Sequence, residues 1–309
     1  MPNAPTLTSF GPGKVILLGE HAVVYGEPAL AGPLSLGVTA QGSPASRCKL
    51  EIPPSVRGRG RKLLTDAFAR AASASGRPKI GVAVSSNLPI SMGLGSSAAL
   101  SVACARILLR AAGKPEKPED VIRVAGEMER EFHAQPSGLD HTCSALRTLI
   151  LFRRSLKGIA PSVSRIESPR PLRLLVALSG KRGPTWKTVT ELKERVARWP
   201  AHYLGLIREI GRIAREGARE IERGDLDALG DAMNVNHGIL TALGVSSPPI
   251  DELVHRLRGL GALGAKLTGA GGEGGAVIGL FLEPEPALVK LTQAGIHCFV
   301  SQVAGPQAL

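Results

Sequence analysis

The chain of 309 residues is poor in aromatic side chains, with only two tryptophans, two tyrosines and six phenylalanines. Proteins that bind single-stranded nucleic acid stack bases on aromatic rings, so this scarcity argues against that class. The densest basic cluster, RGRGRK at 57–62, contains no aromatic residue and is typical of a solvated loop. The net charge of +12 fits a small anionic ligand as well as it fits nucleic acid. We therefore expect no nucleic-acid partner.

Cysteine and long apolar runs are also scarce. The four cysteines lie far apart without C-x-x-C spacing and mostly in apolar surroundings, which favours buried free thiols in a reducing compartment; they are Cys48, Cys104, Cys143 and Cys298. No apolar run approaches the ~18 residues of a membrane span. The first eleven residues lack the charged start and apolar centre of a secretion signal. We expect a cytoplasmic protein with no membrane partner.

Segments of strand and helix type are mixed along the chain. Apolar runs of strand length occupy 14–19, 80–86, 172–180 and 275–283, and helix-period segments occupy 63–75, 97–113, 118–133 and about 200–234. This mixture predicts an α/β or α+β protein. The segment 160–171 is rich in proline and serine, so we place the domain boundary there and predict domains at 1–165 and 166–309.

One glycine-rich stretch, MGLGSSAAL at 92–100, separates a predicted strand from a predicted helix. The first turn of a helix carries unpaired N–H groups at the positive end of its dipole, and anions bind there. Gly93 and Gly95 would let the backbone approach a phosphate closely. Ser96 and Ser97 could cap the helix, donate to phosphate or ligate a phosphate-bound Mg²⁺.

Two other nucleotide-binding loops fit this stretch less well. Residues 93–98 match the dinucleotide pattern G-x-G-x-x-A, but no second strand ending in an acidic residue follows about 20 residues on. A Walker loop requires a lysine after the glycines, and none is present. A structural helix cap on a sheet would be the default interpretation if the loop stood alone.

Three further segments accompany this loop. PGKVILLGEHAVVYG at 12–26 places a lysine at the start of a strand and an acidic–histidine pair after its end. EMEREFHAQPSGLDHTCS at 127–144 places Glu129 beside the buried stripe of a helix and presents Asp140 from a turn after the helix breaks. KLTGAGGEGGAVIGL at 266–280 contains five glycines in seven residues, which suggests a backbone pressed against a neighbour.

In this order, the four elements resemble those of the galactokinase, homoserine kinase, mevalonate kinase and phosphomevalonate kinase (GHMP) superfamily. The matching segments are PGKVILLGEHAVVYG, PISMGLGSSAA, HAQPSGLD and KLTGAGGEGG, with NHGILTALGVSSP at 236–248 as a further match. Within the superfamily, GEHAVVYG is most similar to the mevalonate kinases. The resemblance implies an α+β fold with a ribosomal-protein-S5-like N-terminal domain, a ferredoxin-like C-terminal domain and an active site between them.

The resemblance also implies a role for each matching residue. ATP phosphates would lie over the loop made of Gly93, Leu94, Gly95, Ser96 and Ser97. Ser97 and Glu129 would hold Mg²⁺, and Asp140 would sit by the substrate hydroxyl with Lys14 close to it. The substrate side would comprise Glu20, His21, Thr185, Gly269, Ala270 and Gly271. An aspartate placed there could receive the hydroxyl proton, and a nearby ammonium would stabilise the developing alkoxide.

The sequence departs from the family pattern on the expected substrate side. Gln135 stands where mevalonate kinases commonly have asparagine, His141 follows the aspartate, and Leu100 replaces the tyrosine of animal-type members. Glu273 interrupts the glycines, and we expect its side chain to face away from the phosphates.

The leading hypothesis is an ATP- and Mg²⁺-dependent kinase acting on the primary 5-hydroxyl of mevalonate. A phosphomevalonate, homoserine or sugar kinase and a non-catalytic ATP sensor are the alternatives. The sequence leaves open whether the chain forms a homodimer.

Overall fold

The computed structural model describes residues 6–89, 92–133, 136–158, 160–180 and 185–304. The helices and strands, in chain order, are β1 (Leu7–Leu18), the short 3₁₀ helix η1 (Ala22–Tyr25), β2 (Ala29–Pro44), β3 (Lys49–Glu51), α1 (Gly58–Ser75), β4 (Ile80–Ser86), α2 (Ser96–Ala111), α3 (Pro118–Phe132), α4 (Leu139–Leu146), β5 (Ile150–Arg153), β6 (Ser162–Arg165), β7 (Arg173–Leu178), α5 (Thr185–Arg198), α6 (Pro200–Arg223), α7 (Leu226–Ala242), α8 (Pro248–Gly259), β8 (Gly264–Thr268), β9 (Ala276–Phe281), α9 (Glu285–Gln293) and β10 (Cys298–Gln302).

The chain divides into two compact units made of interleaved segments. Unit 1 comprises Met1–Gly13, Leu36–Pro89 and Gly95–Arg147, and unit 2 comprises Lys14–Ser35, Ile90–Leu94 and Thr148–Leu309. Strands β1 and β2 therefore contribute residues to both units. These units differ from a sequential division of the chain, and the boundary at 165/166 stays a prediction.

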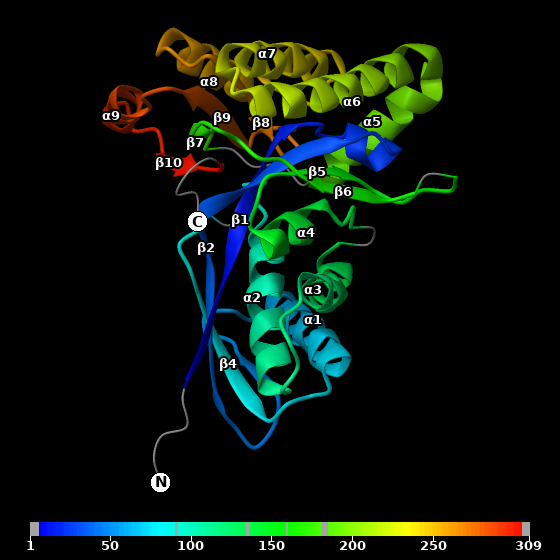
Figure 1. Ribbon diagram of the computed structural model, residues 1–309, viewed down its shortest axis with the longest axis vertical. Helices are drawn as coiled ribbons and strands as arrows, with labels where there is room; N and C mark the ends of the chain where they lie inside the picture. The colour runs from blue at the N-terminus through cyan, green and yellow to red at the C-terminus, as the bar shows by residue number, and fades with distance from the viewer. Residues whose placement is uncertain (1–5, 90–91, 134–135, 159, 181–184, 305–309) are drawn as a thin grey trace. The chain divides into compact units, whose positions relative to one another are not determined.

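Unit 1 combines four helices with a small sheet (Figure 1). The second half of β2 pairs antiparallel with β4, and β3 pairs parallel with β4 on its other side. Helices α1 and α2 both pack on α3, and α4 packs on α2 and α3. Phe68, Val102, Leu108 and Met128 are among the side chains that these helices bury.

Strand β1 lies directly on helix α2 within unit 1. A Cβ atom on Gly11 would fall 2.1 Å from the carbonyl oxygen of Ala99, which is closer than any real contact. Only glycine fits at this position, because any larger residue would push the strand off the helix. The close approach holds β1 against the helix that begins at the predicted phosphate loop.

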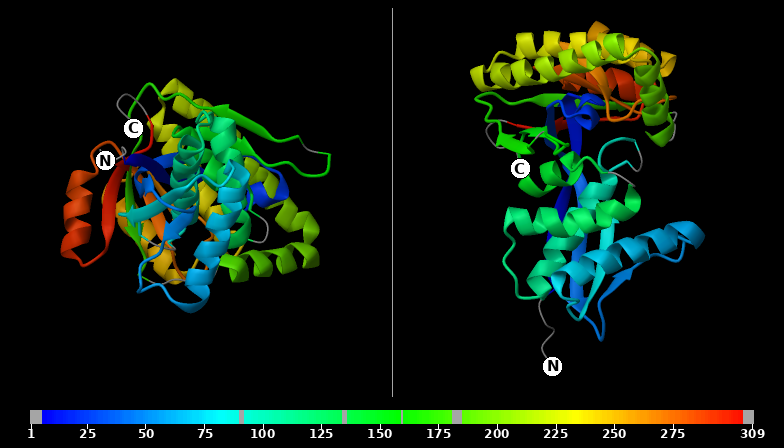
Figure 2. Two further views of the ribbon diagram at one scale, coloured as in Figure 1. Left: turned by 90° about the horizontal axis from the view of Figure 1, so that it is seen from below. Right: turned by 90° about the vertical axis from the view of Figure 1, so that its right-hand side faces the viewer.

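Unit 2 contains a four-stranded antiparallel sheet in the order β10-β7-β9-β8. Helices α7 and α8 pack on β8, α8 also packs on β9, and α6 packs on α7. Figures 1 and 2 show these helices gathered over one face of the sheet. Leu175, Val254 and Leu267 belong to the buried core between the two layers. Helices segregated to one face of an antiparallel sheet are the α+β arrangement.

Most of the predicted elements are confirmed. The four predicted strands correspond to β1, β4, β7 and β9, and the first three helical segments correspond to α1, α2 and α3. The long helical stretch after Pro200 consists of two helices, because α6 ends at the left-handed Gly224 and the Asp225 carboxylate accepts the Ala228 N–H at 2.9 Å to start α7.

All four cysteines are free thiols, as predicted, but the expected burial is wrong for Cys48 and Cys298, which are half-buried. Cys104 and Cys143 are buried, and burial raises the pKa of Cys104 to about 12. Within the described ranges, no helix is long and apolar enough to cross a membrane.

Candidate active site

The predicted phosphate loop leads into helix α2 as expected. Gly93 and Gly95 both have positive φ angles, of 82° and 74°. Gly95 is the residue that caps α2, and it has no side chain that could bond the first-turn N–H groups of the helix. Ser96 and Ser97 are the first two residues of α2, so their N–H groups have no acceptor within the helix itself. The positive φ angles of the two glycines fit the predicted anion-binding turn, and phosphate binding there stays a prediction.

Ser97 and Glu129 come together within unit 1, as the predicted Mg²⁺ ligands should. The Ser97 hydroxyl donates to a carboxylate oxygen of Glu129 at 3.4 Å, and the Ser101 hydroxyl donates to the other oxygen at 3.1 Å. His133 Nε2 lies 3.4 Å from the Ser97 hydroxyl. Helix α3 carries Glu129 against α2, so the carboxylate is only 2% exposed. The serine therefore turns away from capping its own helix and toward a buried acid.

Asp140 lies on a helix, and the expectation that a turn presents it was wrong. Gly138, with a φ of 92°, ends the preceding loop, and Asp140 is the second residue of α4. A carboxylate in the first turn of a helix is stabilised by the positive end of the dipole. Its neighbour His141 is buried, which lowers the pKa of that imidazole, while the Asp140 charge opposes the change. Lys14 belongs to unit 2, and its expected proximity to Asp140 stays a prediction.

Lys14 holds the first half of the phosphate loop within unit 2. Its ammonium donates to the carbonyl oxygen of Gly93 at 3.2 Å, and its backbone N–H donates to the carbonyl of Leu94 at 2.9 Å. A Cβ atom on Gly269 would lie 3.2 Å from the Cα of Gly93, so the two glycine loops touch backbone to backbone. Lys14 is 3% exposed, which places its charge beside this contact in a largely dry setting.

His21 contacts the glycine loop between β8 and β9. Its Nε2 lies 2.9 Å from the carbonyl oxygen of Ala270, and its φ of 60° is in the left-handed region. Burial lowers the pKa of His21 to about 4, while the Ala270 carbonyl opposes this change and Lys266 adds to it. The imidazole is therefore neutral at pH 7. Because a carbonyl only accepts hydrogen bonds, Nε2 carries the proton and Nδ1 is an acceptor.

Glu20 is fully buried and forms an ion pair with Lys266, a residue for which no role was predicted. Lys266 lies in the middle of β8 and is also fully buried. A signal was present, because this lysine opens the KLTGAGGEGG motif inside an otherwise apolar strand. A contact of Glu20 with substrate stays a prediction.

Gly271 and Gly272 of the KLTGAGGEGG segment lie against the loop that follows α7. A Cβ atom on Gly271 would lie 2.1 Å from the carbonyl oxygen of Val245, and the Gly272 N–H donates to that oxygen at 2.8 Å. The Glu273 carboxylate pairs with Lys187 of α5 at 3.0 Å. The predicted close packing of this loop is confirmed, and Glu273 is accounted for by an exposed ion pair.

A cavity of about 210 Å³ borders this loop in unit 2. Its lining residues are Lys187, Thr188, Glu191, Gly244, Ser246, Ser247, Gly272 and Glu273. Thr185 begins α5, one turn from this cavity, but its side chain lies outside the described residues, as does Gln135. Their predicted places on the substrate side stay predictions.

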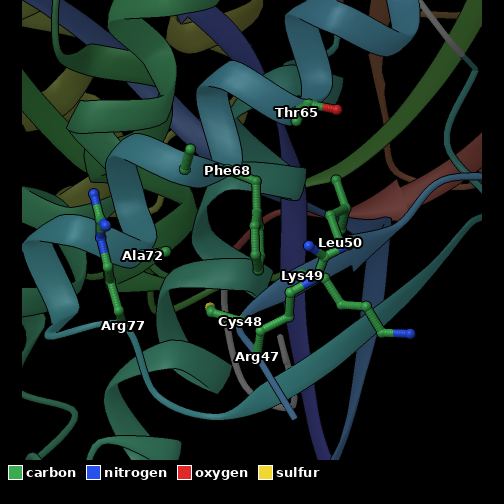
Figure 3. Close-up of a pocket in the computed structure, with 9 residues that line it drawn as sticks. Arg47, Cys48, Lys49, Leu50, Thr65, Phe68, Ala72 and Arg77 are labelled. Atoms are coloured by element: carbon green, nitrogen blue, oxygen red, sulfur yellow. The ribbon is translucent and has the colours of Figure 1, made fainter. Parts of the chain in front are cut away.

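A larger cavity of about 510 Å³ lies in unit 1, between β3 and α1 (Figure 3). It is lined by Arg47, Cys48, Lys49, Leu50, Thr65, Phe68, Ala69, Ala72 and Arg77, none of which is a predicted site residue. The basic cluster at 57–62 is not the predicted loop, because residues 58–62 begin α1. Within it, Arg61 has a structural role and donates to the carbonyl oxygens of Ile52, Pro53 and Val56.

Two family models match the chain. The model described as GHMP kinases N terminal domain matches residues 62–148, and the model described as GHMP kinases C terminal matches residues 217–297. The mevalonate kinase of Aeropyrum pernix is 34% identical over 317 residues, which cover 95% of this chain and 94% of that protein. The mevalonate kinase of Thermococcus sibiricus is 32% identical over 295 residues, which cover 85% and 86%.

Solved structures of mevalonate kinases have a similar fold. The L. major mevalonate kinase in complex with R-mevalonate matches with a TM-score of 0.85 at 27% identity, and the match covers 98% of each chain. The Methanococcus jannaschii mevalonate kinase matches with a TM-score of 0.80 at 24% identity over 98% of this chain and all of that chain, which bears on the fold alone. The predicted two-domain α+β fold is therefore confirmed.

Proposed function

The chain belongs to the GHMP kinase family, and we propose that within this family it is a mevalonate kinase. The reaction transfers the γ-phosphoryl group of ATP to the primary 5-hydroxyl of (R)-mevalonate and yields 5-phosphomevalonate and ADP. Curated relatives of this name match most of the chain at 31–34% identity, and one structural neighbour was solved with R-mevalonate bound.

The observation that carries the kinase proposal is the contact of Ser97 with Glu129 at the start of α2. A hydroxyl and a carboxylate are hard oxygen donors of the kind that Mg²⁺ selects, and they lie beside backbone N–H groups suited to phosphate. No three His, Cys, Asp or Glu side chains among the described residues form a metal-holding group. The cation would therefore take its other ligands from the phosphates and water, as in other kinases.

The residues of this chain divide the remaining work. When bound, Mg²⁺ supplies positive charge to the phosphates. The amides of 93–97 orient the phosphates, and Lys14 brings a buried ammonium to the same loop through Gly93. Asp140 receives the proton of the substrate hydroxyl as the oxygen–phosphorus bond forms. His21, neutral at pH 7, offers a hydrogen-bond acceptor on the substrate side.

A coupled assay of ADP release tests the proposal. Wild-type protein with Mg-ATP is offered mevalonate, phosphomevalonate, homoserine or galactose, and we expect turnover on mevalonate. Asp140→Asn is expected to lower kcat by about 10²–10⁴-fold, the usual value of a general base. Asp120→Asn, at a half-buried position on α3 where the carboxylate pairs with Arg123, is the matched control and should keep wild-type kcat.

The assay separates the proposal from its alternatives. Turnover on another substrate of the panel would retain the kinase and replace its substrate. ATP binding without turnover on any of the four would favour the ATP sensor.

A further inference from the structure

Lys266 is the largest fully buried side chain of the described residues and it carries a charge. It lies on β8 between Ala265 and Leu267, both of which are also fully buried. Removing an ammonium from water costs several kcal/mol, so such a lysine persists only where specific groups compensate it. Strand β8 leads directly into the glycine loop of the proposed active site.

The ammonium of Lys266 has two acceptors. It donates to one oxygen of the Glu20 carboxylate and, at 2.6 Å, to the carbonyl oxygen of Leu267. Burial lowers the pKa of Lys266 and raises that of Glu20, while each partner's charge opposes these changes. The second oxygen of Glu20 is buried and has no hydrogen-bond partner among the described residues. The geometry of the carboxylate therefore depends on the lysine.

The turn that contains Glu20 is held from both sides. The Gly19 N–H donates to the amide oxygen of Asn236 at 3.3 Å, and His21 donates to the Ala270 carbonyl at 2.9 Å. Because His21 has a φ of 60°, its ring direction depends on how this strained turn is anchored. Glu20 lies between the two residues that make these hydrogen bonds, and its carboxylate forms the ion pair with Lys266.

We propose that Lys266 is a positioning residue for substrate binding. Its ammonium fixes the Glu20 carboxylate and, through the Glu20–His21 peptide, holds His21 against Ala270, so that His21 presents its Nδ1 lone pair to a hydroxyl group of the substrate. This inference rests on the proposed function, because the hydrogen-bond acceptor concerned, Nδ1 of neutral His21, belongs to the proposed mevalonate site.

The charge of Lys266 has a second effect on the imidazole. The charged or titratable groups that interact with Lys266 are Lys14 in β1, Glu20 and His21 in the turn that follows β1, and His237 in α7. Burial is the main cause of the lowered pKa of both His21 and His237, and the positive charge of Lys266 lowers each pKa further. It therefore favours the neutral imidazole that can accept a hydrogen bond.

The test removes the charge at nearly constant length with Lys266→Met, and Lys290→Met on the exposed face of α9 is the matched control. We expect the KM for mevalonate to rise about tenfold, the value of one hydrogen bond, and the KM for ATP to change by less than about twofold. The control should leave both unchanged. An unchanged KM for mevalonate in Lys266→Met would overturn the inference.

Because Lys266→Met leaves a buried carboxylate unpaired, the variant could fail to fold. Lys266→Met/Glu20→Gln removes both charges and is expected to recover most of the Tm. Histidine-selective ¹⁵N NMR then reads His21 directly in whichever variant folds. We expect wild-type His21 to be the Nε2–H tautomer, titrating at about 4, and its pKa to rise when Lys266 is removed.

An identical tautomer of His21 with and without Lys266 would contradict the positioning role, since loss of the lysine charge alone would shift the titration of the imidazole but not its tautomer. A wild-type protein inactive on mevalonate would refute the proposed function, and the His21 tautomer would still decide the role of Lys266.

Discussion

Glu129 accepts hydrogen bonds from two serines, and the proposal gives those serines different tasks. Ser97 is the proposed Mg²⁺ ligand, whereas Ser101 is fully buried one turn further along α2. We predict that Ser97→Ala raises the Mg²⁺ concentration needed for half-maximal activity about tenfold and leaves the Tm nearly unchanged. Ser101→Ala should lower stability by about 1 kcal/mol and leave the Mg²⁺ requirement near wild type.

Magnesium titrations of activity and thermal unfolding of both variants check this assignment. Equal Mg²⁺ requirements for the two variants would show that Ser97 only braces Glu129.

A second prediction concerns His237, which is buried and whose Nε2 is hydrogen-bonded to Oδ1 of Asp251 at 3.1 Å. Burial and the charge of Lys266 lower its pKa to about 4 from an ordinary value of 6.5, although Asp251 opposes the shift. Between these two values the unfolded chain binds more protons than the folded chain, so stability is lost as the pH falls. From pH 7 to pH 5 this histidine alone should remove about 2 kcal/mol.

Urea unfolding of wild-type protein and His237→Gln at pH 7 and pH 5 measures this effect. The variant should lose less stability than the wild type over that interval. Equal losses of stability in both proteins would mean that the pKa of His237 is the same in the folded and unfolded states.

At this scale the sequence predicts only some of the contacts in the candidate site. The proximity of Ser97 and Glu129 is implied by the family resemblance, which gives both as Mg²⁺ ligands, whereas the contact of His21 with Ala270 was not predicted. The sequence gives no sign that Glu20 is fully buried or that Lys266 is its partner, because that pairing depends on how β8 packs against the segment after β1.

At the scale of elements, the glycine loop between β8 and β9 combines unusual backbone angles with tight packing. Gly271 has a φ of 64°, and a Cβ atom on it would lie 2.1 Å from the carbonyl oxygen of Val245. Gly261 has a φ of 96°, and a Cβ atom on it would meet no atom within 4 Å. Gly261→Ala should cost about 1–2 kcal/mol, the strain of a left-handed residue. Gly271→Ala should cost about 1–3 kcal/mol more, because the Val245 backbone must also move.

Chemical denaturation of the two variants measures that difference. Equal destabilisation by the two substitutions would show that the loop tolerates displacement and is not fixed by its contact with Val245.

Element prediction succeeded for the four apolar strand segments and for α1 to α3, but it missed the amphipathic helix α5 and the long strand β2. The long strand β2 contains Gly32, Pro33, Gly37 and Gly42, which lower its apparent strand propensity. Tertiary packing explains two of these glycines, since a Cβ on Gly37 or Gly42 would overlap a neighbouring strand or core side chain. Such demands are visible only in the folded chain.

At the scale of the whole molecule, ligand binding should raise stability by mass action. Mg-ATP at about 100 times its Kd should stabilise the protein by about 2.7 kcal/mol. Asp140→Asn should retain this stabilisation, because Asp140 is proposed to receive a proton and not to hold ATP. NAD⁺ at the same concentration should give no shift, since 93–98 lacks the second half of a dinucleotide site. Thermal unfolding with each ligand checks the three expectations, and a shift with NAD⁺ alone would reject the phosphate-loop interpretation.

The interleaving of the two units was not predicted from sequence. Composition marks linkers, but here β1 and β2 pass from one unit to the other within regular strands, where composition does not change. The net charge of +12 fits a protein that binds ATP and a carboxylate substrate, although it does not by itself select them.

The most direct test of the central claim is to identify the product. Purified protein is incubated with (R)-mevalonate and Mg-ATP, and the products are analysed by mass spectrometry and ³¹P NMR. The account predicts equimolar ADP and mevalonate that has gained one phosphoryl group on its primary 5-oxygen. ADP without phosphorylated mevalonate, or a phosphoryl group on a different oxygen, would contradict it.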